Sequence, residues 1–188
     1  IIADDADNDA LSFAVLGGNT GGIFSIDHNS GLIRLNDDGL LDFETTAGYS
    51  LNVAVTDASH PEFNSTALVL INVSDINEAP VINGAYITAS EDTASGSVID
   101  TITAADPDGS PLTLEIIAGN ESGVFALDPT DGFLTIANTA RFSVAANPQF
   151  TLVVRARDNG MPFLFDTAEI RISPSSVLIA EGAIARVR

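Results

Sequence analysis

The sequence repeats itself at a fixed offset of 101 residues, and this repeat limits the possible folds more than any other feature. Residues 22–27, GIFSID, recur as residues 123–128, GVFALD. A period held without gaps across most of a chain indicates tandem modules. The same offset pairs Gly31 with Gly132, Tyr49 with Phe150, Leu51 with Leu152, Asp57 with Asp158, and Pro61 with Pro162.

Each copy of the repeat carries the alternating pattern that is typical of β-strands. Apolar Leu51, Val53 and Val55 alternate with small or polar neighbours, and residues 150–156 do the same. Gly, Asn, Asp and Pro separate such runs, and we find no apolar stripe at helical spacing. About seven short strands in about 100 residues are typical of a Greek-key β-sandwich. We therefore predict an all-β chain of tandem Greek-key β-sandwiches with immunoglobulin-like architecture.

The repeat also predicts the domain boundaries. We expect a first repeat at residues 1–80 and a second at residues 81–176. The second has residues 81–98 ahead of its Asp-Pro-Asp segment, whereas only four residues precede Asp5, so the first should lack its opening strand. Residues 177–188 form either a tail or the start of a further module. Because the pattern is already under way at its first residue, we expect the chain to be part of a longer protein.

Charge and cysteine content exclude several classes of protein. The 188 residues include 26 acidic and 7 basic side chains, which gives a formal net charge of −19. All seven basic residues are arginines and there is no lysine, too few basic side chains for binding nucleic acids or anionic membranes. It has no cysteine, so disulfides, thiolate metal sites and a cysteine nucleophile are excluded. The acidic residues either solvate the surface or bind cations.

Pairs of carboxylates recur at equivalent positions of the two copies. Asp5 and Asp7 correspond to Asp106 and Asp108. An i, i+2 spacing puts both side chains on one face of a strand, and in a loop it lets both reach one ion. An Asp-Pro-Asp-Gly segment also suits a plain polar turn. A single pair would favour the turn, whereas repeated pairs together with further acidic motifs favour an ion.

The linker between the copies, residues 74–80 with the sequence SDINEAP, is rich in oxygen-bearing side chains. Ca²⁺ takes six to eight oxygen ligands at about 2.3–2.6 Å, more than one short linker supplies. Further ligands must therefore come from both copies, and seven carboxylates gathered there would repel one another without counter-ions. We expect one Ca²⁺ junction that involves Asp42, Glu44, Asp75, Asn77, Glu78, Asp106, Asp108 and Asp158.

The order of these motifs resembles that of cadherin repeats over residues 1–176. The motifs that carry the resemblance are Glu91, the Asp5/Asp7 and Asp106/Asp108 pairs, LDFE at 41–44, Asp57 and Asp158 at strand ends, and DINEAP at 75–80. The resemblance implies an extracellular rod of repeats, part of a membrane-anchored or secreted protein, that Ca²⁺ stiffens for homophilic or heterophilic cell adhesion. It also implies that the eight junction residues bind Ca²⁺, and that Asp5, Asp7 and Asp57 belong to an incomplete upstream site.

The chain departs from the family pattern at the end of the second copy. The linker itself is one residue short, with Glu78 where the family has aspartate. In the second copy, the positions equivalent to five junction residues carry no carboxylate. Asp42, Glu44, Asp75, Asn77 and Glu78 correspond there to Ser143, Ala145, Ser176, Leu178 and Ile179. Losing the whole set removes the ligands of a site, so we predict no Ca²⁺ at that end.

Other residues carry weaker signals. We expect His28 and His60 to be exposed loop histidines rather than metal ligands. Asn64, Asn72 and Asn120 fit the acceptor pattern for N-linked glycans. The apolar residues near loops either belong to the core or form a contact patch, and we favour the core for Phe63, Met161, Phe163 and Phe165.

Two functions remain open from the sequence. The first is a Ca²⁺-dependent adhesion or spacer module whose partners are further cadherin-like repeats and an adhesion partner. The second is a carbohydrate-binding β-sandwich of a microbial surface protein or a polysaccharide-degrading enzyme. The aromatic content of 6% with no tryptophan weighs against the second. Catalysis is not expected, because no serine–histidine–aspartate order is supported and the two copies share no histidine.

Overall fold

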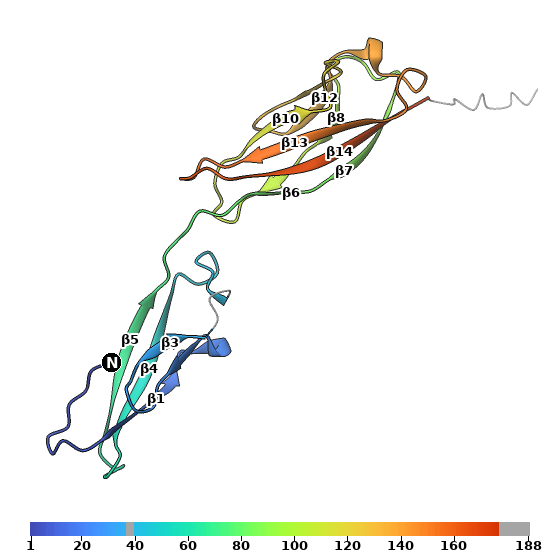
Figure 1. Ribbon diagram of the computed structural model, residues 1–188. Coiled ribbons are helices and arrows are strands. Elements are labelled where there is room, and N and C mark those ends of the chain that lie inside the picture. The colour runs from blue at the N-terminus through green and yellow to red at the C-terminus, as the bar shows by residue number, and fades with distance from the viewer. Residues whose placement is uncertain (37–39, 177–188) are drawn as a thin grey trace, which may run out of the picture. The chain divides into compact units, whose positions relative to one another are not determined.

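The computed structural model describes residues 1–36 and 40–176, and almost all of their regular structure is β. The chain divides into two compact units, Ile1–Ile76 and Asn77–Arg188, called here the first and second unit. The prediction of an all-β chain is confirmed (Figure 1). Among the described residues, no helix has the length and apolar character needed to cross a membrane. The predicted tail at residues 177–188 lies outside this described part.

The first unit contains two antiparallel sheets. One has the order β1-β4-β5, and the other pairs β2 with β3. Leu51 and Val53 in β4 are fully buried and pack with Ile23 and Phe24, which confirms the predicted alternation. The strands are β1 (Leu11–Gly17), β2 (Phe24–Ile26), β3 (Ile33–Leu35), β4 (Gly48–Asp57) and β5 (Asn64–Asn72), with a 3-10 turn η1 at Thr20–Gly22.

The second unit follows the same plan with more strands. Its sheets have the orders β10-β13-β14-β7 and β11-β12-β8, and β6 pairs with β9 (Figure 1). A 3-10 turn η3 covers Thr139–Arg141. The strands are β6 (Val81–Ile82), β7 (Ala85–Ser90), β8 (Val98–Thr101), β9 (Ala104–Ala105), β10 (Thr113–Ala118), β11 (Phe125–Leu127), β12 (Phe133–Ile136), β13 (Phe150–Arg157) and β14 (Phe165–Ser175).

The core of the second unit lies between its two larger sheets. Leu152 and Val154 of β13 are fully buried, as period-2 alternation predicts. Three phenylalanine rings pack at one end of this core. Phe125 meets Phe150 edge-on at 5.1 Å between ring centroids and Phe142 at 5.9 Å. These buried side chains fix the strands whose ends carry the acidic loops.

The last strand of the main sheet has different pairing partners in the two units. β14 lies between β13 and the parallel strand β7, with Ile170 opposite Ala85. β5 pairs with β4 and is the edge strand of its sheet. Ile172 of β14 is fully buried, whereas its equivalent in β5, Ile71, is only half-buried. The repeat boundaries at residues 80 and 176 stay predictions.

Candidate functional site

The two acid pairs lie in equivalent loops, one before β1 in the first unit and one before β10 in the second. Asp5 Oδ1 accepts hydrogen bonds from the backbone N–H groups of Asp7 and Asp9, at 2.9 and 3.0 Å. Asp106 Oδ1 accepts one from the N–H of Ser110 at 3.2 Å. One oxygen of the leading aspartate therefore shapes the loop, and the other oxygen is left for a different partner.

The loop of the second unit holds two buried oxygens whose charge is not satisfied. Asp106 Oδ2 and Asp108 Oδ1 are inaccessible to water, and neither has a hydrogen-bond partner among the described residues. The second oxygen of Asp108, Oδ2, accepts the backbone N–H of Glu78 at 2.9 Å. Burying a carboxylate oxygen without a donor is costly, so native proteins pair such groups or coordinate them to metals. This donor set fits a hard cation.

Asn77 joins the same region to the end of β13. Its amide Nδ2 donates to Asp158 Oδ2 at 2.7 Å and to the carbonyl of Pro162 at 3.0 Å. Asp158 is only 4% exposed. Burial acts most strongly on the pKa of Asp158 and raises it, but the hydrogen bonds from Asn77, Leu164 and Gly160 together lower that pKa below its usual value. Asp158 is therefore ionised at neutral pH and presents a buried negative charge.

Five of the predicted Ca²⁺ ligands thus gather at one end of the second unit, which we call the aspartate end. The consecutive residues Asn77 and Glu78 each contact one of its loops. Every potential ligand there is an oxygen, the donor that Ca²⁺ prefers. The residues of the aspartate end are Asn77, Glu78, Asp106, Asp108 and Asp158.

The predicted ligands of the first unit also have structural partners. Asp42 accepts hydrogen bonds from the backbone N–H and the hydroxyl of Thr45, at 2.9 and 2.8 Å, and these lower its pKa. Glu44 and Asp75 each bring a carboxylate oxygen within 4.8 Å of the other. Their assignment as Ca²⁺ ligands stays a prediction.

At the opposite end of the second unit, which we call the Glu91 end, the side-chain carboxylate of Glu91 accepts a backbone hydrogen bond. Glu91 follows β7, and its backbone N–H donates to the carbonyl of Ser175 at the end of β14, 3.0 Å away. Glu91 Oε2 accepts the N–H of Val144 at 3.1 Å, and Ser143 Oγ accepts the N–H of Ala146 at 3.2 Å. The two apolar positions predicted there, Leu178 and Ile179, lie outside the described residues.

The predicted core positions near the loops are wrong. Phe63, Met161, Phe163 and Phe165 are all exposed, Met161 almost completely so. Arginine guanidinium groups lie over two of the rings, Arg157 over Phe163 at 5.2 Å and Arg155 over Phe165 at 5.7 Å. Cation–π contacts with arginine partly shield these rings without any burial in the core.

One histidine has partners that the sequence did not indicate. His60 is exposed and lies in a loop, as expected, but its Nδ1 lies 3.3 Å from Asp57 Oδ2 and 3.6 Å from Asp9 Oδ2. Because Met161 stands at the equivalent position of the second unit, the 101-residue offset could not indicate these contacts.

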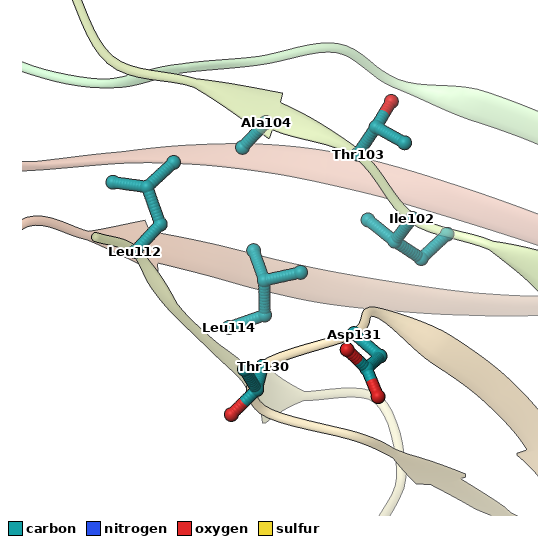
Figure 2. A pocket seen from close by; sticks show the side chains of 7 residues that line it. All are labelled: Ile102, Thr103, Ala104, Leu112, Leu114, Thr130 and Asp131. Atoms are coloured by element: carbon teal, nitrogen blue, oxygen red, sulfur yellow. The ribbon is translucent and has the colours of Figure 1, made fainter. Parts of the chain in front are cut away.

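A small cavity in the second unit offers no convincing ligand site. It measures about 170 Å³, below the roughly 300–1,000 Å³ of typical small-molecule pockets. Figure 2 shows aliphatic side chains along most of its wall, with Asp131 at one edge. The lining residues are Ile102, Thr103, Ala104, Leu112, Leu114, Thr130 and Asp131.

Comparisons with known proteins agree with the motif order. The cadherin domain family matches residues 1–74 and again residues 86–173. Protocadherin Fat 2 of Mus musculus is 31% identical over 171 residues, which cover 88% of this chain and 4% of that protein. Protocadherin Fat 1 of Homo sapiens is 33% identical over 176 residues, which cover 90% of this chain and 4% of that protein. The chain therefore spans only a small part of the length of these relatives.

Solved structures show the same fold. A protocadherin gammaB7 EC3-6 cis-dimer structure aligns with a TM-score of 0.66 at 26% identity, covering 92% of this chain and 42% of that chain. Mouse cadherin-23 EC22-24 aligns with a TM-score of 0.67 at 24% identity, covering 89% of this chain and 53% of that chain.

Proposed function

The chain belongs to the cadherin family, and from this membership we propose that it is a pair of adhesion repeats joined by a Ca²⁺-filled junction. Cadherin repeats are extracellular parts of membrane proteins, so this pair lies outside the cell. Repeats of this family act by binding and by mechanical linkage, not by catalysis. The central question of function is therefore how the linker connects the two repeats and what keeps it rigid.

The observation that carries the proposal is the pair of buried, unpartnered oxygens on Asp106 and Asp108. Each of these carboxylates already uses its other oxygen to accept a backbone N–H. Two buried negative oxygens with no donor destabilise the fold unless a cation binds them. A hard divalent ion satisfies both at once, because Ca²⁺ accepts several carboxylate oxygens in flexible geometry.

The proposed ligand set spans both units. The second unit would contribute the residues of its aspartate end, where Asn77 and Glu78 offer amide and carboxylate oxygens beside the loop. Bound Ca²⁺ would neutralise the gathered carboxylates and tie the linker to both repeats. The first unit would contribute Asp42, Glu44 and Asp75.

A second, incomplete site is proposed at the other end of the first unit, formed by Asp5, Asp7 and Asp57. Asp57 is buried there, which matches the burial of Asp158 at the equivalent position. The family pattern adds a first-strand glutamate to such a set, and in the second unit that residue is Glu91. Such a site needs ligands from a neighbouring repeat, so further repeats of the same protein are proposed partners, together with a homophilic or heterophilic adhesion partner.

Solution scattering tests the proposal most simply. In millimolar Ca²⁺ the chain should behave as an elongated particle with a narrow distribution of dimensions, because the ions fix the linker. After chelation the distribution should broaden, since the carboxylates repel one another. Asp106→Ala should resemble the chelated protein even in Ca²⁺, while the control Glu91→Gln should respond to Ca²⁺ as the unmodified chain does. Identical scattering with and without Ca²⁺ would count against the proposal.

A further inference from the structure

A cluster of three potential metal ligands lies in the loops of the first unit. Asp9, Asp57 and His60 each place one ligand atom within 4.8 Å of the other two. His60 Nδ1 is 3.3 Å from Asp57 Oδ2 and 3.6 Å from Asp9 Oδ2. The ring nitrogen therefore faces two carboxylate oxygens, one from the last residue of β4 and one from the loop before β1.

Local hydrogen bonds hold the cluster in place. Asp57 Oδ1 accepts the backbone N–H groups of Ser59 and His60 at 2.7 and 3.0 Å, so Oδ2 is the oxygen turned to the imidazole. The N–H of Asp9 is anchored on Asp5 Oδ1 at 3.0 Å. The ring of Phe63 lies beside the imidazole, with 6.0 Å between centroids. These hydrogen bonds pre-position the ligand atoms, so little reorganisation is needed to bind a metal.

The distances suit a small tetrahedral ion. Zn²⁺ binds imidazole nitrogen at about 2.0–2.1 Å and carboxylate oxygen at about 2.0–2.2 Å. A tetrahedral angle between such bonds separates the ligand atoms by roughly 3.3–3.6 Å. Both measured separations from His60 Nδ1 agree with this range.

We propose that Asp9, Asp57 and His60 form a Zn²⁺ site in the first unit. The imidazole ligand distinguishes this site chemically from the Ca²⁺ junction, because Ca²⁺ prefers oxygen ligands whereas imidazole is a common ligand of Zn²⁺. His60 and Asp9 belong to none of the proposed Ca²⁺ ligand sets, whereas Asp57 is shared with the proposed incomplete upstream site. The fourth position of the tetrahedron is open to water, since His60 and Asp9 are partly exposed.

The second unit provides an internal comparison. Asp158 stands at the position of Asp57, but Ser110 and Met161 replace Asp9 and His60 at the 101-residue offset. Asp158 Oδ2 accepts the amide of Asn77 at 2.7 Å instead of facing an imidazole. The Zn²⁺ site is therefore specific to the first unit.

Titration of the whole 188-residue chain with Zn²⁺ in millimolar Ca²⁺ tests this proposal. Excess Ca²⁺ saturates the complete oxygen-only sites. The proposed upstream Ca²⁺ site shares Asp57 but lacks its ligands from a neighbouring repeat, so the Zn²⁺ binding that remains reports on the imidazole site. We expect one equivalent to bind, with a shift of the His60 ring signals in the NMR spectrum. His60→Met, which installs the residue of the second unit, should weaken binding at least about tenfold, because one ligand is lost. Asp9→Ser should weaken it as well.

The matched control is His28→Met, which removes the other histidine and should leave Zn²⁺ binding unchanged. Melting curves in chelator will show that each variant is folded. Zn²⁺ binding of equal strength in the unmodified chain and in folded His60→Met would overturn the proposal. So would unmoved His60 signals at saturating Zn²⁺, which is the behaviour of a plain histidine–aspartate ion pair. Both outcomes are independent of Ca²⁺ at the junction.

Discussion

The two ends of the second unit differ in the hydrogen-bond partners of their carboxylate oxygens. At the aspartate end, Asp106 Oδ2 and Asp108 Oδ1 are buried without any donor among the described residues. At the Glu91 end, Glu91 Oε2 accepts the backbone N–H of Val144. The same sandwich therefore has one end where two carboxylate oxygens lack a hydrogen-bond donor, and one end where a carboxylate oxygen accepts a backbone N–H.

The difference shows which acidic residues need a cation and which serve the fold. A turn in the first unit uses Asp42 to accept the N–H of Thr45, and the equivalent turn in the second unit uses Ser143 for Ala146. A neutral hydroxyl serves that turn as well as a carboxylate does. The turn alone therefore does not require the negative charge of Asp42, and a metal-binding role gives a reason for it.

The largest expected effect is the stabilisation of the aspartate end by Ca²⁺. A ligand that binds only the folded state adds RT ln(1 + [L]/Kd), about 2.7 kcal/mol at free Ca²⁺ of about 100 times Kd. Chelation should therefore lower the melting temperature of the chain. Glu91→Gln should melt with the same Ca²⁺ dependence as the unmodified protein. A melting temperature that does not change on chelation would remove the distinction between the two ends.

A second expected effect changes sign with Ca²⁺. Asp106→Asn removes a buried, unpartnered charge, so in chelator it should stabilise the fold by about 1 kcal/mol. In Ca²⁺ the same variant should melt below the unmodified chain, because a carboxylate ligand is lost. Paired melting curves in the two buffers measure both signs. A variant that is destabilised equally in both would show that Asp106 is only a loop residue.

Acid should act on the aspartate end through Asp158. Its pKa is lowered from the ordinary value of 3.8, so the ionised carboxylate stabilises the fold above pH 3.8. That contribution is lost as the pH falls through the lower pKa of the folded state. Melting temperatures in chelator, taken from about pH 5 down to about pH 2.5, should fall less steeply for Asp158→Asn than for the unmodified chain. Equal slopes would contradict this role.

The smallest expected effect is at the Glu91 end. The double variant Ser143→Asp/Ala145→Glu restores two acidic positions without the linker residues that the first unit has. Two ligands do not make a Ca²⁺ site, so calorimetry should count the same number of bound ions as in the unmodified chain. An additional tight ion would show that two carboxylates are enough there.

The strands and the acidic loops could be predicted from the sequence because their signals are local or repeated. Alternation with a period of two identified β4 and β13, and the buried residues Leu51 and Leu152 confirm it. The 101-residue offset predicted equivalent loops at Asp5 and Asp106, and both loops form hydrogen bonds to the leading aspartate.

Contacts between distant segments could not be predicted in this way. The sequence placed Asn77 and Asp158 in one junction, but it did not indicate the hydrogen bond that Asn77 donates to Asp158 across 81 positions of sequence. Hydrophobicity placed Phe163 and Phe165 in the core, whereas both are exposed beside arginines of β13. His60 lacks a repeat partner, so the offset gave it no function, and only the three-dimensional structure shows its contacts with two aspartates.

Calorimetric titration of the metal-free chain with Ca²⁺ is the most direct test of the junction. The unmodified protein should bind more than one ion, and Glu91→Gln should bind the same number. Asp108→Ala removes one of the two unpartnered oxygens and should lose at least one ion. An unchanged number of bound ions in Asp108→Ala would contradict a Ca²⁺ junction built on the aspartate end.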